Sequence, residues 1–136
     1  MKLRHLPPRI ATGAFILNSG LNKRNVDPGT AAGMHGMAAG AYPFLGKLEP
    51  EKFTRLLSAG EVALGGALLL PIVPTALAGA GLAAFSAGLV GLYLQTPGMR
   101  QDGSVRPTQD GTGLAKDVWM LGIGLGFVIE ALTDAD

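Results

Sequence analysis

The sequence contains no cysteine and only two histidines, His5 and His35. Without cysteine the chain has no disulfide, no thiolate nucleophile and no ligand for a zinc-thiolate or iron–sulfur centre. Two histidines are too few for a multi-histidine metal site or a b-type haem. Met34 and Met37 flank His35 in a pattern that would suit copper, but no second cluster completes a coordination sphere. We therefore expect His35 to pack or to form an interfacial hydrogen bond, and we predict no metal site.

Charge is also scarce. Charged residues make up 15% of the 136-residue chain, against about 25% in an ordinary soluble domain. The net charge is +1, and no basic block is longer than Lys23-Arg24. A nucleic-acid partner needs a clustered basic face, so none is expected. No Ser-His-Asp set, phosphate-binding loop or metal-binding helix motif is present either. Chemistry would need an external cofactor or partner, and the chain alone is not expected to be an enzyme.

A long apolar run takes up much of what remains. Between Glu61 and Arg100, 38 residues carry no charged side chain. About 20 apolar residues are enough to cross a bilayer as a helix, and Pro71 and Pro74 divide the run near its middle. We therefore predict two antiparallel membrane helices joined by the tight turn LLPIVPTA.

The whole chain reads as one all-α domain, an integral membrane four-helix bundle. The expected spans are residues 6–21, 50–70, 74–94 and 114–132, with a short interfacial helix at 28–39 in the first loop. Asp27-Pro28 and Glu49-Pro50 mark helix starts, because proline is favoured at the first helical position and Asp27 suits the N-cap. The first span is short, and it crosses only if Arg9 extends toward the headgroups.

Four spans place both termini on the same side of a cell membrane. The terminal side then carries three Lys and Arg residues and the opposite side carries eight. The positive-inside rule accordingly favours termini outside. Around the first helix alone the balance is reversed, three against two.

Glu61 is the first candidate functional residue, because an ionisable side chain within a span costs about 2.5–3.5 kcal/mol on insertion scales. Helical side chains point toward the helix N-terminus, so its carboxylate should lean toward the side that carries Lys23 and Lys116. Two interpretations remain open: an ion pair or hydrogen bond that fixes the bundle, and a ligand-binding or catalytic site. Lys23, Arg24, Lys116 and Asp117 are expected at the same face, where they either bind an anionic headgroup or a quinone carbonyl or anchor helix ends.

Small residues recur every four positions along the predicted helices. Such spacing is typical of close helix contacts in membranes. On the third span the rows are Gly79, Ala83, Ala87, Gly91 and Ala80, Ala84, Gly88; Gly122 and Gly126 follow on the fourth, and Gly60 with Gly65-Gly66 on the second. They predict a tight bundle and a capacity for self-association.

The order of these features resembles the DoxX family of small bacterial membrane proteins. The likeness rests on a short first helix closing on Lys23-Arg24, on GEVALGGALLLP around Glu61 and on AKDVWMLGIGLG, where a Lys-Asp pair precedes an apolar run. It covers residues 6–132. It implies a four-helix membrane bundle, with Glu61, Lys23, Lys116 and Asp117 at the family's polar positions. Some relatives are subunits of quinone-linked oxidoreductases, including thiosulfate:quinone oxidoreductase.

The expected function is therefore an accessory subunit of a quinone-linked membrane oxidoreductase system. No covalently bound cofactor is expected, and the expected non-covalent one is a quinone. The expected partners are the lipid bilayer and either a membrane redox protein or further copies of the chain. Two alternatives stay open: a membrane scaffold or assembly protein that packs through its small-residue faces, and a small homo-oligomeric permease.

Overall fold

The computed structural model describes residues 2–109 and 111–133. All regular secondary structure within them is helical, and the long loop holds an isolated bridge between Arg100 and Pro107. The elements are η1 (Leu3–His5), α1 (Leu6–Asn22), α2 (Pro28–Ala41), η2 (Pro43–Lys47), α3 (Pro50–Leu69), α4 (Thr75–Gln95), α5 (Thr112–Ala115) and α6 (Asp117–Thr133). The predicted all-α class and the order of the helices are confirmed.

The helix starts follow the local sequence signals. The Asp27 carboxylate accepts a hydrogen bond from the backbone N–H of Thr30 at 3.1 Å, and Pro28 is the first residue of α2. Hydrogen bonds from the Thr30 hydroxyl and from its backbone N–H hold the pKa of the Asp27 carboxyl below its usual value. Pro50 likewise opens α3. The loop helix extends to Ala41, two residues beyond the predicted end, and then breaks at Tyr42-Pro43.

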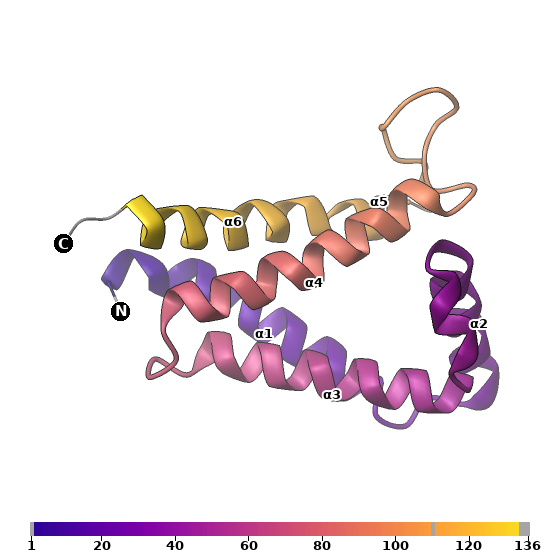
Figure 1. Cartoon of the computed structure of the whole chain (residues 1–136), viewed down its shortest axis with the longest axis horizontal. Coiled ribbons are helices and arrows are strands. Elements are labelled where there is room, and N and C mark those ends of the chain that lie inside the picture. The colour runs from indigo at the N-terminus through magenta and orange to yellow at the C-terminus, as the bar shows by residue number, and fades with distance from the viewer. Residues whose placement is uncertain (1, 110, 134–136) are drawn as a thin grey trace.

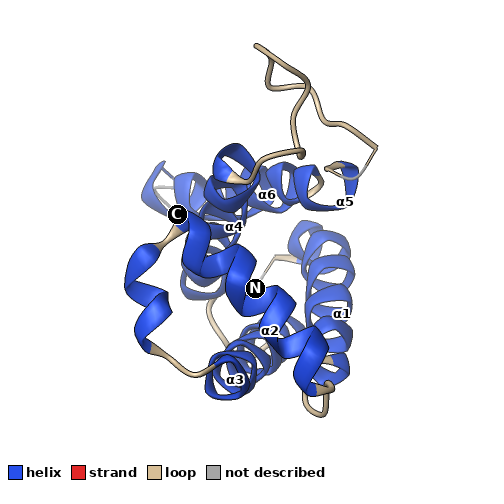
Figure 2. Cartoon of the chain, turned by 90° about the vertical axis from the view of Figure 1, so that its right-hand side faces the viewer, coloured by secondary structure: helices blue, strands red, loops and turns tan. Residues whose placement is uncertain are grey.

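The long helices form two tightly packed pairs (Figure 1). α1 lies along α3, and α4 lies along α6. The pairs meet at the turn 70–74, where Ile16, Leu68, Ala78 and Leu82 form a shared buried core. Away from this turn α3 and α4 diverge, and α2 crosses the wide end of the bundle, as the view from that end shows (Figure 2).

Glycines allow the helices within each pair to approach closely. A Cβ atom built at Gly65 of α3 would lie 2.6 Å from the backbone nitrogen of Leu17, and one at Gly124 of α6 would lie 2.6 Å from that of Ala83. By contrast, a Cβ atom at Gly60, Gly122 or Gly126 would meet nothing within 4 Å. Close contact within the bundle is therefore confirmed for Gly65 and Gly79. Five other predicted glycines make no such contact within the chain: Gly60, Gly66, Gly88, Gly122 and Gly126.

Arg9 is buried, which its prediction as a residue that extends toward the headgroups did not include. It is 1% exposed, and its guanidinium reaches the turn 70–74, where it caps the C-terminal end of α3. Helix ends leave backbone carbonyls without partners, and a planar group with five donors can serve several of them at once. The acceptors, all at 2.8–2.9 Å, are the backbone oxygens of Ala67, Leu68, Leu70 and Val73 and the hydroxyl of Thr75.

The last predicted helix needs a second correction. It was expected to run from residue 114, but the chain turns at Lys116 and α6 begins at Asp117. The backbone N–H of Trp119 bonds back to the carbonyl of Lys116 at 2.9 Å, which closes a tight turn. The preceding short helix, α5, is separate.

By length and composition, α4 is the one helix of the described chain that is long and apolar enough to cross a membrane. α1 and α6 have 17 residues each. α3 is long enough but carries four charged residues, Glu51, Lys52, Arg55 and Glu61. The four predicted spans thus correspond to four observed helices, of which α4 alone meets both criteria.

Candidate ligand-binding cavity

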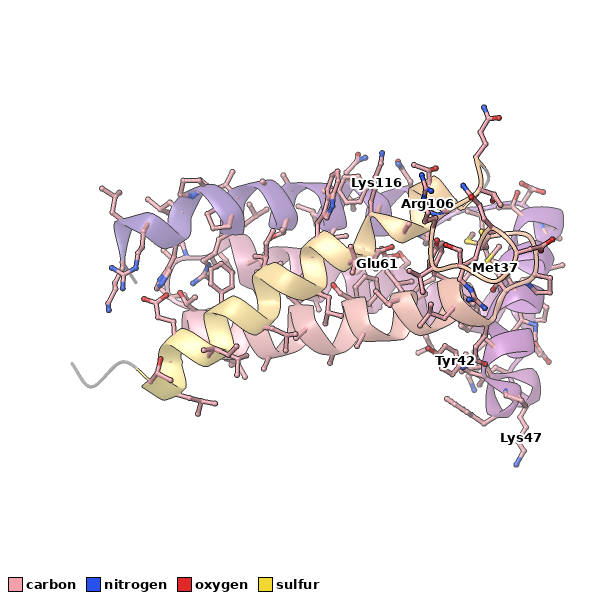
Figure 3. All side chains as sticks on the ribbon, turned by 90° about the horizontal axis from the view of Figure 1, so that it is seen from above. Met37, Tyr42, Lys47, Glu61, Arg106 and Lys116 are labelled. Atoms are coloured by element: carbon pink, nitrogen blue, oxygen red, sulfur yellow. The ribbon has the colours of Figure 1, made fainter. Side chains whose placement is uncertain are left out.

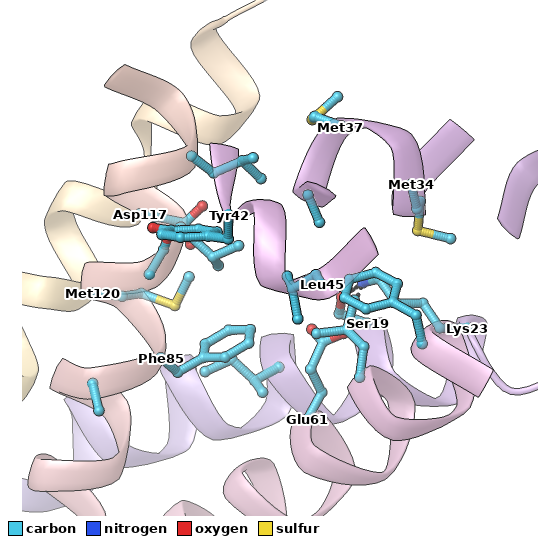
Figure 4. Close-up of a pocket in the computed structure, with 18 of the residues that line it drawn as sticks. Ser19, Lys23, Met34, Met37, Tyr42, Leu45, Glu61, Phe85, Asp117 and Met120 are labelled. Carbon is cyan, nitrogen blue, oxygen red and sulfur yellow. Dashed lines mark hydrogen bonds and ion pairs between the residues drawn. The ribbon is translucent and has the colours of Figure 1, made fainter. Parts of the chain in front are cut away.

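A cavity of about 750 Å³ lies in the wedge between the two helix pairs, beneath α2. Its size falls in the range of about 300–1,000 Å³ typical of small-molecule sites. Its position follows from the fold: α1 and α3 form one wall, α4 and α6 the other, and α2 with η2 covers the wide end (Figure 4).

Most of the lining is apolar, aromatic and thioether side chains. Phe15, Phe53, Phe85, Met34, Met37 and Met120 all contribute to it. Aromatic faces and flexible methionines adapt to irregular apolar ligands. Such a surface favours an occupant that is mainly hydrocarbon or aromatic.

Glu61 and Lys23 form an ion pair on the cavity wall. Glu61 is 3% exposed, and the Lys23 Nζ lies 2.9 Å from its Oε1 atom. The same ammonium donates a hydrogen bond to the Ser19 hydroxyl, one turn earlier on α1. Glu61 therefore faces the interior, leaning toward Lys23 as its place in the sequence predicts.

The close contact between α1 and α3 fixes this pair. A Cβ atom at Gly20 would lie 2.9 Å from the Glu61 Cβ, so the two backbones approach at the level of the carboxylate. The Ser58 hydroxyl also donates to the Gly20 carbonyl at 2.7 Å. Because Gly20 has no side chain, α1 and α3 approach closely enough for Lys23 to reach Glu61.

Asp117, the first residue of α6, lines the cavity from the opposite wall. It is 7% exposed. Among the residues the structure describes, none donates a hydrogen bond to its carboxylate or forms an ion pair with it. The charges of Glu61 and Lys23 nevertheless act on it electrostatically. Figure 4 places it beside Tyr42 on the α4–α6 side.

Lys116 does not belong to this cluster. Its side chain is exposed and does not line the cavity, and Figure 3 shows it at the edge of the bundle while Glu61 lies between the helices. Successive helical residues point roughly 100° apart, so the turn before α6 directs only Asp117 inward. Arg24 also lies elsewhere, in a surface groove with Arg55. Of the predicted cluster, Glu61 and Lys23 form an ion pair, and Asp117 lines the same cavity.

Tyr42 is a site residue that the sequence analysis did not identify. Its hydroxyl donates to the Gly88 carbonyl of α4 at 2.6 Å and so ties the end of α2 to the second helix pair. His35 serves the same segment: its Nε2 lies 2.8 Å from the Leu45 carbonyl, and its ring packs edge-on against Phe53. The signal for Tyr42 was its position at the break before Pro43, where an aromatic ring with a polar tip ends an apolar helix.

A second polar cluster closes the opposite end of the bundle. The Glu130 carboxylate accepts a hydrogen bond from Arg4 and lies 2.7 Å from the His5 Nε2. Lys2 is 3.7 Å from the same carboxylate. These contacts join the start of α1 to the end of α6, so both lie at the same end of the bundle, away from α2 (Figure 1).

No group of three or more residues suited to hold a metal ion occurs in the described part of the chain. Comparisons with protein-family models, curated proteins and solved structures found no match.

Proposed function

We propose that the chain is a DoxX-like integral membrane protein. It exposes large apolar side chains and buries charged ones: Leu77 is 66% and Trp119 69% exposed, while Arg9, Glu61 and Asp117 are buried. Only 33% of the apolar stretch of α4 is buried within the protein. A soluble core helix would be mostly covered, whereas a lipid-facing helix keeps its apolar surface outward. This pattern supports the proposal.

The bundle matches a bilayer in length if its ends reach into the headgroups. α4, with 21 residues, is about 32 Å long, and the 17-residue helices α1 and α6 about 25 Å. A hydrocarbon core is about 30 Å thick. The charged first turns of α3 and the polar cluster around Glu130 would then lie at opposite interfaces.

Within this class we propose an accessory subunit of a quinone-linked oxidoreductase system. The observation that carries the proposal is the cavity, an apolar and aromatic chamber with a polar patch on its walls. A quinone has that composition, an isoprenoid tail and a ring with two carbonyl oxygens. Lys23 is the donor suited to a ring carbonyl, and Phe85 and Phe53 offer faces for the ring. When bound, the quinone supplies the two-electron, two-proton chemistry, and the electrons come from a partner protein.

Purification of the tagged chain from gently solubilised membranes tests this function. We expect redox subunits in the eluate and quinone in its organic extract. Lys23→Gln should lower the quinone content several-fold, and Lys116→Gln, an exposed lysine outside the cavity, should not. Equal quinone in all three preparations, at the level of an unrelated membrane protein, would refute quinone binding.

A specific observation favours one second candidate. Gly122 and Gly126 lie four residues apart on an outward face of α6, with open space above them. Gly60 on α3 also has open space above it. Such small-residue faces suit contact with a further helix. A scaffold or assembly protein would use them, and the same eluate would then contain partners without redox centres.

A further inference from the structure

The Asp117 carboxylate is buried and faces the cavity without a hydrogen-bonding or ionic partner in the described chain. Burying a charge is costly unless it is paired, so buried carboxylates in proteins normally have a partner. Lys23, the cation on this cavity's lining, is already 2.9 Å from Glu61 and bonded to Ser19. An unpaired carboxylate in such a place either holds a proton or meets a cationic ligand that enters the cavity.

The charges lining the cavity favour the cationic ligand. Two carboxylates, Glu61 and Asp117, share it with one ammonium, that of Lys23. With all three ionised, the apolar chamber holds an excess of one negative charge. An occupant with one positive charge would balance it, and an anion would double the imbalance.

We propose that the cavity is a binding site for a hydrophobic organic cation, an amine or onium compound with a bulky apolar body. Its charge lies against Asp117. Tyr42 lies beside this carboxylate and Phe85 lines the cavity beyond Met120, and aromatic ring faces attract cations. The apolar body fills the remainder, between Met120 and the α1–α3 wall. This activity goes beyond the proposed role in a quinone-linked system.

Two probes of the same shape and opposite charge separate recognition of charge from non-specific hydrophobic binding. Tetraphenylphosphonium is a cation, and tetraphenylborate is its anionic counterpart. The purified full chain is reconstituted in nanodiscs of uncharged lipid, and binding of tritiated tetraphenylphosphonium is measured by scintillation proximity. We expect saturable binding that excess unlabelled cation abolishes. Because the two ions pair in a mixture, binding of labelled tetraphenylborate is measured in a separate sample, and no saturable binding of it is expected.

Variants of opposite sign test the residues. Asp117→Asn removes one negative charge and should weaken cation binding by about tenfold or more, as expected for a partly desolvated pair. Lys23→Gln removes the positive charge and should strengthen it. Asp102→Asn, an exposed carboxylate in the long loop outside the cavity, is the matched control and should bind as the unmodified chain does.

Opposite shifts in the two cavity variants would support the site and could not come from a general loss of folding. Equal affinity in the Asp117 variant and the unmodified chain, or saturable binding of borate and phosphonium with equal affinity in separate samples, would overturn the proposal. Absence of any saturable binding would also overturn it, and would mean that Asp117 holds a proton instead. None of these outcomes depends on quinone in the extract or on redox subunits in the eluate, so this proposal and the proposed function can fail separately.

Discussion

Arg9 shows how much one side chain can contribute at a helix end. Its guanidinium binds four backbone carbonyls and a hydroxyl where α3 gives way to the turn 70–74. Helix ends leave their last carbonyls without partners within the helix, and the buried Arg9 supplies donors to them. A residue whose sequence position suggests an interfacial anchor is therefore packed inside the end of the bundle.

Arg9→Met should lower stability markedly, because each buried carbonyl left without a donor costs about 1–3 kcal/mol. We expect a melting temperature clearly below that of the unmodified chain in the same detergent. Arg9→Lys should fall between them, because an ammonium lacks the planar fork. Arg55→Met, at an exposed site on α3, is the control. If Arg9→Met and Arg55→Met melt alike, the capping contacts contribute little.

At the scale of whole elements, each helix pair depends on a few positions where no side chain fits. Gly65 and Gly66 are neighbours on α3, yet a Cβ atom at the first would be 2.6 Å from the α1 backbone while one at the second would meet nothing within 4 Å. The two positions therefore form a matched comparison in which sequence neighbourhood and residue type are the same.

Gly65→Ala should destabilise the protein by about 1–3 kcal/mol, the usual cost of overfilling a packed contact. Gly66→Ala should be neutral or stabilising by up to about 1 kcal/mol, because alanine favours the helix over glycine. Thermal melting in detergent would measure the stability of both variants, and size-exclusion profiles would show whether each remains folded. An equal fall in the two variants would argue against the close approach of α1 and α3.

The signals that predicted the fold were local. Pro28, Pro50 and Pro74 with their preceding residues mark helix starts through backbone geometry alone, and the structure follows them. Which face of a helix meets its neighbour depends on residues distant in the chain. Glycines occur on both faces of α3 and α6, so spacing could not choose Gly65 over Gly60 or Gly124 over Gly122. The same limit explains why the position of Lys116 could not be predicted. The chain turns at this residue before α6 begins, so Lys116 is exposed while Asp117 lines the cavity.

At the scale of the whole molecule, the start of α1 and the end of α6 are held together by Glu130 and His5. A measurement of which side of the membrane one of these two helix ends faces therefore locates the other end as well. Because the chain has no cysteine, a single introduced thiol is labelled without background.

With eight of eleven basic residues on the side away from the termini, we expect the long loop to face the cytoplasm. Asp102→Cys should resist a membrane-impermeant maleimide in intact cells and react after lysis. A cysteine added after Asp134 should react in intact cells. The reverse labelling would show that the charges around α1 decide orientation, and release of the protein by a carbonate wash would remove the membrane assignment altogether.

The two helix pairs share a buried core toward the turn 70–74, and α3 and α4 diverge at the other end (Figure 1). A helix of 20 residues is about 30 Å long, so a rotation of about 5° at that pivot separates the far ends by roughly 2.5 Å. The wedge can thus change width without repacking Gly65 or Gly124 inside either pair. The hydrogen bond from the Tyr42 hydroxyl to the Gly88 carbonyl joins the end of α2 to the second pair. It therefore limits how far the cavity can widen.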